Sequence, residues 1–158
     1  MQQPQFSPIY LAVPFALQQK EGQCLAACAA MTLAYLNVPF SYRRLLNLLE
    51  IQEFGASFFN LQHLEALGVR VSLSRRGTLI DLYKHLCNGH PCIVSVMTHE
   101  LPYWNGEAVL HALVVIGIDP LYIYLNDPEF ADSPMKASHG NFELAWLERD
   151  EAYAVLTR

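Results

Sequence analysis

The feature that most constrains the fold is a run of small and apolar residues from Cys24 to Leu36, CLAACAAMTLAYL, which contains no charged residue. A helix that is apolar all round is stable only when it is buried. The turn-forming pair Gly22-Gln23 stands directly before the run, so we expect a buried helix over residues 25–36 that starts at the cysteine. A thiol in this position meets unpaired backbone N–H groups and the positive end of the helix dipole, which favour the reactive thiolate.

The rest of the chain carries separate signals for helices and strands. Start and stop residues predict helices over residues 42–50, 58–67 and 79–87, behind Ser41, Ser57 and Thr78, and a last helix from an Asn141 cap through Leu147. Apolar alternation or continuous apolar runs predict strands over residues 69–73, 92–97, 111–118, 122–126 and 152–157. We therefore expect an α+β domain whose helical N-terminal half packs on a mainly antiparallel sheet.

Length and charge exclude several classes of protein. The chain has 158 residues, which suits a single domain over residues 1–158 with one sizeable core. Its ten Lys and Arg residues are scattered and its formal charge is −5, so we expect no nucleic-acid partner. No apolar run is long enough to cross a bilayer, and the N-terminus lacks the pattern of a secretory signal. These observations predict a cytoplasmic protein whose four cysteines are reduced thiols.

The surface is expected to be poor in charge. Charged residues make up only 16% of the chain, against 53% hydrophobic residues. This balance favours an apolar groove, or an interface with a protein partner or a second copy in a homo-oligomer. A somewhat larger core explains the same composition equally well.

A histidine and an aspartate far downstream complete a set of residues that suits thiol chemistry. His111 opens the strand-like stretch HALVVIGID, and Asp127 ends the stretch LYIYLND. If the two strands form a hairpin, Asp127 returns to the end where His111 lies, whereas Asp119 sits roughly 26 Å further along. Asp127 is therefore the preferred partner of the imidazole. Glu129 and Asn126 stay open as alternatives, because the register does not follow from sequence.

This arrangement predicts a Cys24 nucleophile, a His111 base and an orienting Asp127. The oxyanion that forms in such a reaction needs hydrogen-bond donors already oriented toward it. The backbone N–H of Cys24 and the side-chain amide of Gln18 or Gln19 would supply them. No metal or cofactor is required. Each residue taken alone is more often structural, and only their joint order favours the catalytic interpretation.

Several short motifs, spread over nearly the whole chain, match one peptidase family. They are Val13-Pro14, Gln18 ahead of Cys24, the small-residue helix Ala26 to Met31, His111 with its apolar strand, and Asp127-Pro128, with weaker similarity through Gly89-His90-Pro91 and from Asn141 to Trp146. With these motifs the chain resembles the bacteriocin-processing, or double-glycine leader, cysteine peptidases of the papain-like clan.

The resemblance implies a papain-like fold and hydrolysis of a peptide bond through a thioester acyl-enzyme, with leader-peptide processing as the specific form of that activity. It also implies a peptide or protein substrate, no cofactor, and Gln18 rather than Gln19 as the oxyanion donor. Family members usually carry Gly after the nucleophile, where this chain has Leu25, so we expect a narrower approach to the thiol. The best-known members are joined to a membrane transporter, whereas we expect this chain to be free-standing.

Two other functions use the same residues. One is a catalytically silent peptide-binding or regulatory module, and the joint presence of Cys24, His111 and Asp127 argues against it. The other is an acyl or amide transferase that passes the thioester to an amine, which differs from a hydrolase only in the access of water to the acyl-enzyme.

Three aromatic residues are candidates for contact with the substrate. Tyr103 and Trp104, in the loop before His111, are expected to line the substrate cleft, and Phe58 adds an apolar surface for a peptide side chain.

Another group has the residue types of a zinc site, namely Cys87, Cys92, His85 and His90. One of its cysteines lies at a helix end and the other opens a buried strand, with no second ligand pair at finger spacing, so we expect no metal there.

Overall fold

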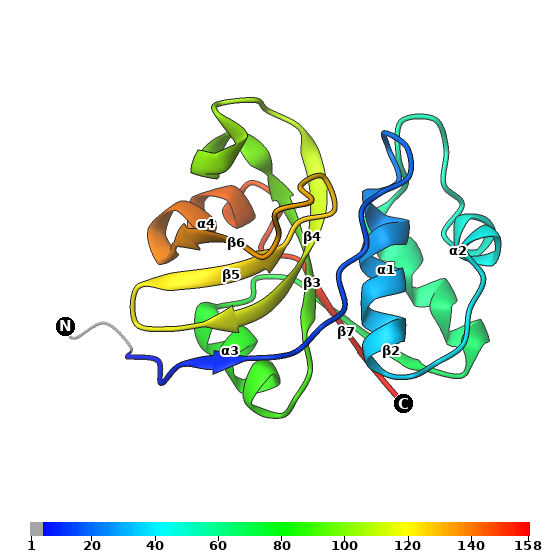
Figure 1. Ribbon diagram of the computed structural model, residues 1–158, viewed down its shortest axis with the longest axis horizontal. Coiled ribbons are helices and arrows are strands. Elements are labelled where there is room, and N and C mark those ends of the chain that lie inside the picture. The colour runs from blue at the N-terminus through cyan, green and yellow to red at the C-terminus, as the bar shows by residue number, and fades with distance from the viewer. Residues whose placement is uncertain (1–4) are drawn as a thin grey trace.

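The computed structural model describes residues 5–158, in which helices cover both faces of one sheet (Figure 1). The helices are α1 (Cys24–Tyr35), α2 (Tyr42–Leu48), α3 (Leu79–Cys87) and α4 (His139–Leu147), with the short 3-10 helices η1 (Phe58–Leu67), η2 (Thr98–Glu100) and η3 (Pro102–Trp104). The strands are β1 (Ile9–Tyr10), β2 (Arg70–Ser74), β3 (Cys92–Met97), β4 (Leu110–Ile118), β5 (Tyr122–Asn126), β6 (Met135–Ser138) and β7 (Tyr153–Thr157). Within residues 5–158 no helix combines the length and apolar character needed to span a membrane.

The sheet is built around β4. Its strand order is β2-β7-β3-β4-β5-β6, and β1 pairs with β4 beside this path. Each pairing between the described strands is antiparallel, as expected. The register of β4 places Val96 of β3 opposite His111 and Asn126 of β5 opposite Val114. The start of β4 and the end of β5 therefore lie at the same end of the sheet.

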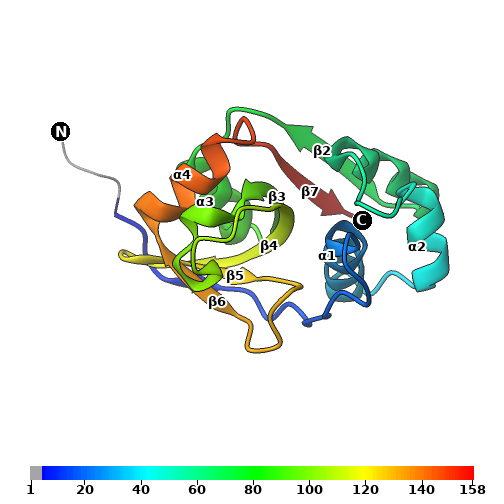
Figure 2. The same cartoon turned by 90° about the horizontal axis from the view of Figure 1, so that it is seen from above.

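The sheet divides the apolar interior into two layers. On β4, Ala112, Val114 and Ile116 pack toward α1, α2 and η1, whereas Leu113 and Val115 pack toward α3 and α4. The view from above shows these two groups of helices on opposite sides of the strands (Figure 2). Because successive strand side chains point to opposite faces, a strand covered on both faces has a continuous apolar sequence, as β4 does.

Helix α1 is the buried helix expected after Gly22. Every residue from Leu25 to Leu33 is buried, and the helix begins at Cys24 itself. The N-cap residue Gln23 forms no side-chain hydrogen bond to the helix; instead its Oε1 accepts a hydrogen bond from the Tyr42 hydroxyl at 2.9 Å. The first N–H groups of α1 therefore have no side-chain cap from Gln23. Cys24, the first residue of the helix, lies at the positive end of the helix dipole.

Two of the predicted start signals act as expected. The Ser41 hydroxyl accepts a hydrogen bond from the backbone N–H of Arg44 at the start of α2. Thr78 and Asp81 form the reciprocal capping box that begins α3.

Other boundaries differ from the prediction. Residues 58–67 form a 3-10 helix rather than an α-helix, and Ser57 makes no side-chain cap. The last helix starts earlier than predicted, because Ser138 is its N-cap and Asn141 lies in its first turn with its N–H bonded to the Ser138 hydroxyl. Strands β1 and β6 were not predicted, since two and four residues carry too little periodicity to detect.

Candidate active site

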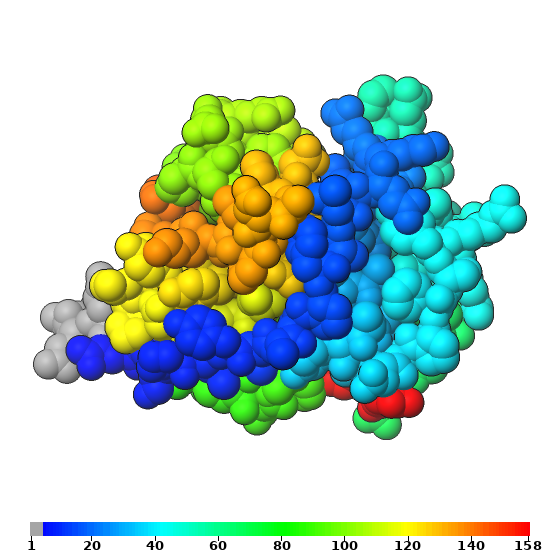
Figure 3. All heavy atoms as spheres, in the orientation of Figure 1, coloured from blue at the N-terminus to red at the C-terminus, as the bar shows by residue number. Residues whose placement is uncertain are grey.

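Cys24 and His111 line one cleft at the upper end of the molecule. Cys24 is the first residue of α1, and His111 is the second residue of β4, and both elements begin at this end (Figure 1). The cleft has a volume of about 1020 Å³, and Leu25, Trp104 and Ala112 also line it. The space-filling view shows a notch here, between the segment that precedes β4 and the segment that precedes α1 (Figure 3).

The structure pairs His111 with Asp127. Nε2 of His111 lies 2.7 Å from Oδ1 of Asp127, and both side chains are buried. Asn126, the last residue of β5, is opposite Val114, so Asp127 continues β5 toward the level of His111, as the hairpin argument predicts. Asp119 lies at the far end of the hairpin, where it accepts hydrogen bonds from Tyr10 and Tyr124.

The two alternative partners of the imidazole are engaged elsewhere. Asn126 Nδ2 donates to the carbonyl oxygen of Val13 at 3.3 Å. The Glu129 carboxylate accepts a hydrogen bond from Gln18 Nε2 at 2.6 Å. The register leaves Asp127 as the carboxylate against the ring.

Asp127 is held by donors from several segments. Oδ2 accepts hydrogen bonds from the Tyr103 hydroxyl at 2.7 Å and from Trp104 Nε1 at 3.0 Å. Oδ1 also accepts one from the backbone N–H of Glu129 at 3.1 Å. The Ser133 hydroxyl lies 3.0 Å from the Asp127 backbone nitrogen and 3.1 Å from its carbonyl oxygen. A fully buried carboxylate with this many donors has one orientation, and that orientation directs it at His111.

These contacts shift the ionisation of both groups in the pair. Burial disfavours a charged imidazole, but the hydrogen bond to Asp127 and the neighbouring Cys24 thiol outweigh it and raise the pKa of His111 to about 10. Burial also disfavours the carboxylate, yet the hydrogen bonds from His111 and Tyr103 lower the pKa of Asp127 below its usual value. The structure therefore favours an imidazolium–carboxylate pair beside the thiol.

Of the three aromatic residues expected to contact the substrate, Trp104 and Phe58 line the cleft and Tyr103 does not. Trp104 lines the cleft, and its ring packs edge-on against His111 with the centroids 5.0 Å apart. Phe58 also lines the cleft, although it is only 9% exposed. Tyr103 is not among the described residues of the cleft wall, because its hydroxyl turns toward Asp127. Contact between Tyr103 and a substrate stays a prediction, and the structure adds its hydrogen bond to Asp127.

Gln18 lies in the cleft wall beside Asp127-Pro128. Its backbone N–H donates to the Pro128 carbonyl oxygen at 2.8 Å, and Glu129 holds its Nε2. Its Oε1 is buried without a hydrogen-bond partner among the described residues. Gln19 lines the same cleft. Neither the link from Gln18 to Glu129 nor the donation of Tyr103 and Trp104 to Asp127 was predicted, because all of these contacts join distant loops.

The opposite wall comes from the loop before η1. Gln52 and Gly55 close this loop with backbone hydrogen bonds, and Phe54 at its tip is 94% exposed. The loop approaches Gly22, where an added Cβ would lie 2.8 Å from the Glu53 carbonyl oxygen. Gly22 also has φ +82°, which favours glycine. A residue without a side chain at position 22 thus lets the two walls meet ahead of Cys24.

The zinc-type residues are not clustered. Cys92 is buried and Cys87 is exposed. Within the described part of the chain, the one set of three or more metal-type ligand atoms lying within 4.8 Å of one another is His99, Glu100 and Glu148. His99 Nε2 lies 3.5 Å and 3.6 Å from the two carboxylates, which are ion-pair distances when the ring is protonated.

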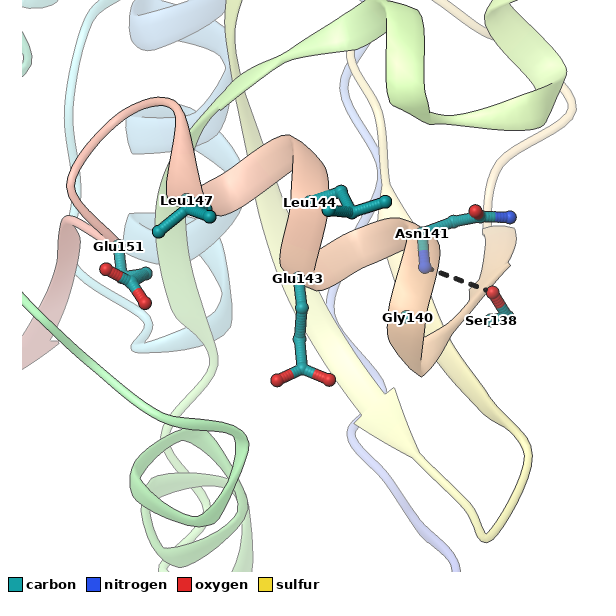
Figure 4. Close-up of a pocket in the computed structure, with 7 residues that line it drawn as sticks. All are labelled: Ser138, Gly140, Asn141, Glu143, Leu144, Leu147 and Glu151. Atoms are coloured by element: carbon teal, nitrogen blue, oxygen red, sulfur yellow. Dashed lines mark hydrogen bonds between the residues drawn. The ribbon is translucent and has the colours of Figure 1, made fainter.

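A second hollow, of about 510 Å³, lies along α4 (Figure 4). It is lined by Ser138, Gly140, Asn141, Glu143, Leu144, Leu147 and Glu151. The close-up shows Leu144 and Leu147 along the helix and the hydrogen bond that caps its start. This hollow contains neither a thiol nor an imidazole, so the chemistry-bearing residues belong to the first cleft.

Solved structures share this fold. The chain matches a protein described as a C39-like peptidase from Bacillus anthracis with a TM-score of 0.78 and 19% identity, covering 96% of this chain and 98% of the other. It matches a double glycine motif protease from an AMS/PCAT transporter, solved with the leader peptide, with a TM-score of 0.69 and 21% identity, covering 97% and 99%. The peptidase domain of Streptococcus ComA, a bi-functional ABC transporter involved in quorum sensing, matches with a TM-score of 0.73 and 18% identity, and the match covers 90% of this chain and 96% of the other.

The sequence comparisons give a family but no close relative. No curated protein matches the chain. The model of the Peptidase C39 family matches residues 12–149, which is most of the chain. Together with the fold and a cleft lined by a thiol and an imidazole, this match shows that the chain belongs to the peptidase C39 family.

Proposed function

We propose that this protein is a cysteine peptidase in which Cys24 is the nucleophile, His111 the general base and Asp127 the residue that orients the ring. The observation that supports this most directly is the 2.7 Å contact between His111 Nε2 and Asp127 Oδ1, in a cleft that Cys24 also lines. Because Asp127 occupies Nε2, the other ring nitrogen, Nδ1, is the one left to exchange a proton with the thiol.

The reaction would proceed in two stages. The thiol proton already lies on Nδ1 of His111 before the substrate binds, because the ring beside Asp127 is an imidazolium, and the Cys24 sulfur attacks the carbonyl carbon of the scissile bond. The imidazolium then protonates the leaving amine as the C–N bond breaks, which leaves a thioester on Cys24. Water, deprotonated by the now neutral His111, attacks the thioester and releases the acid product. The negative charge of Asp127 stabilises the imidazolium in both stages.

The oxyanion would be bound by the backbone N–H of Cys24 and by the side-chain amide of Gln18. The uncapped start of α1 supplies the first donor. Gln18 Nε2 carries two N–H groups, and Glu129 takes one of them. The second N–H remains for an oxyanion in the cleft.

A peptide is the substrate class that fits the cleft best. The C39 family and the solved leader-peptide complex of a structural relative support a peptide substrate, and processing after a double-glycine motif is the specific form we propose. Leu25, which follows the nucleophile, is only 4% exposed and packs in the core, and it also lines the cleft beside Cys24.

Alkylation tests the nucleophile. We expect iodoacetamide near pH 6 to modify Cys24 first, as shown by peptide mapping, and the rate to fall at least about tenfold in His111→Ala, because the variant loses the imidazolium that stabilises the thiolate. Cys87, which is exposed and outside the cleft, is the internal control and should react equally in both proteins. Equal reactivity of Cys24 and Cys87 in the native protein would contradict the assignment.

Hydrolysis tests the activity and the substrate. A panel of peptides with and without a double-glycine site is incubated with the native protein, Cys24→Ser and Gln18→Ala. We expect cleavage after the double glycine, none with Cys24→Ser, and a kcat about 100-fold lower with little change in KM for Gln18→Ala. Equal cleavage of peptides with and without the double glycine would contradict leader processing but would still support a peptidase activity.

A further inference from the structure

A tight turn after α4 carries Arg149 to the edge of the catalytic cleft. Glu151 and Arg149 both donate backbone N–H groups to the Trp146 carbonyl oxygen, and Trp146 Nε1 donates to the Ala152 carbonyl oxygen at 2.8 Å. Asp150 and Glu151 have φ values of 57° and 48°, so the chain reverses sharply here. The backbone of this turn is therefore held in one conformation, and Arg149 lines the cleft.

The guanidinium of Arg149 is mostly free. Its one hydrogen bond among residues 5–158 runs from Nε to the Ser95 hydroxyl at 3.4 Å. No carboxylate in that part of the chain lies within 4.0 Å of it. Both terminal NH₂ groups are thus available for a bidentate contact with a carboxylate from outside the protein.

Arg149 lines the same cleft as Cys24 and His111 and contacts a strand next to the one that carries His111. Ser95 on β3 pairs directly with Ala112 on β4, and Ala112 is the neighbour of His111. Ser95 and Ala112 both line the cleft, and they share the face of the sheet that packs against α1, whose first residue is Cys24. Paired strand residues are about 5 Å apart, so Ser95 is about two residue lengths from His111. A peptide that presents its scissile bond to Cys24 would pass Arg149 within a few residues.

None of the other charged side chains of the cleft forms an ion pair with this cation among the described residues. Those on described residues are Lys20, Glu21, Glu53, Glu107 and Glu129. Glu129 is bonded to Gln18, and Glu21 and Glu53 belong to the opposite wall around Gly22. Glu107 stays more than 4.0 Å from Arg149. An arginine near the end of a helix also suits the helix dipole, but that role does not require the side chain to turn to Ser95.

We propose that Arg149 selects substrates with an acidic side chain, Asp or Glu, within a few residues of the scissile bond. This inference rests on the proposed peptidase function and adds the substrate class that the cleft prefers. The substrate carboxylate would bind the terminal NH₂ groups of Arg149, while Nε continues to donate its hydrogen bond to the Ser95 hydroxyl.

A positional-scanning peptide library tests the preference. Each position around the scissile bond is fixed in turn to Asp, Glu, Asn, Gln or Lys, and kcat/KM is measured for the native protein, Arg149→Gln and Arg149→Glu. We expect one position at which the acid is preferred over its amide by about tenfold, the typical strength of a charge-assisted hydrogen bond. The preference should vanish in Arg149→Gln and turn toward Lys in Arg149→Glu. Arg70→Gln, which removes the same charge from an exposed site on β2 outside the cleft, should keep it.

A second readout separates this inference from the proposed function. The same peptides are tested for protection of Cys24 against iodoacetamide, which requires binding in the cleft but no hydrolysis. If the acidic peptides protect Cys24 more strongly but are not cleaved, the role of Arg149 in binding is supported and the proposed peptidase function is contradicted. Cleavage or protection that treats acid and amide alike at every position, or a preference that survives in Arg149→Gln, would overturn the inference.

Discussion

At the scale of single residues, the most informative contact is the buried pair of His111 and Asp127. An imidazole and a carboxylate that are both taken out of water stay charged only when each stabilises the other. Tyr103 and Trp104 add neutral donors to Asp127, and burial together with the Asp127 charge raises the pKa of Tyr103, so its hydroxyl remains a donor. The pair therefore has a fixed charge and a fixed orientation beside the thiol.

This pair makes stability depend on pH in a way that can be measured. The pKa of His111 rises from 6.5 to about 10 on folding, so its contribution is complete below pH 6.5 and is lost as the pH rises through about 10. The pKa of Asp127 falls below 3.8, so its contribution is present above that value and is lost in stronger acid. We expect the difference in unfolding free energy between the native protein and His111→Ala to be largest between about pH 4 and 6.5.

Urea unfolding at a series of pH values measures that difference. His63→Ala is the matched control, because its ring is about half exposed, with a side-chain accessibility of 46%. A difference between the native protein and His111→Ala that stays constant from pH 6 to pH 10 would show that the buried pair is not charged.

At the scale of elements, the cleft depends on how loops approach the start of α1. Gly22 combines a positive φ with a close contact to the loop that carries Phe54. Such positions cannot be identified from a lone glycine in the sequence, because the contact involves a segment about thirty residues away in the chain. The helix starts at Ser41 and Thr78, in contrast, are set within one turn and were correctly predicted.

The contact at Gly22 leads to a paired experiment. Gly22→Ala and Gly68→Ala both place a side chain at a positive φ, at 82° and 88°, but an added Cβ at Gly68 meets nothing within 4 Å. Backbone strain should destabilise each variant by about 1 kcal/mol. Only Gly22→Ala should also displace the cleft wall and lower kcat/KM, by about tenfold or more. Equal activity of the two variants would show that the wall does not help to shape the cleft.

At the scale of the whole molecule, one sheet joins two apolar layers. Leu33 of α1 is fully buried on one face and Leu86 of α3 on the other. Because β4 contributes side chains to both layers, neither layer has a complete core without the other. We therefore expect one folding unit over the described residues, as the sequence predicts for residues 1–158.

Thermal and urea unfolding test that unit. Leu33→Ala and Leu86→Ala should each cost about 2–5 kcal/mol, and each should shift one transition seen by both far-ultraviolet and near-ultraviolet circular dichroism. Two separate transitions, each moved by only one of the variants, would mean that the layers fold independently.

Local chemistry explains what the sequence determined by itself. The buried helix at Cys24, the caps at Ser41 and Thr78 and the hairpin that returns Asp127 to His111 each depend on neighbouring residues or on simple strand geometry. The family resemblance, later shown by the match over residues 12–149, depended on motifs of the same kind. Sequence was therefore sufficient for the α+β fold class, whereas the catalytic triad of Cys24, His111 and Asp127 stays a prediction.

Tertiary structure decided the features that join segments far apart in the chain. The turn of Tyr103 toward Asp127, the link between Gln18 and Glu129, and the placement of Arg149 at Ser95 all arise where loops from different elements meet. No periodicity or spacing encodes such meetings, because the packing of two helical layers on one twisted sheet sets which loops come together.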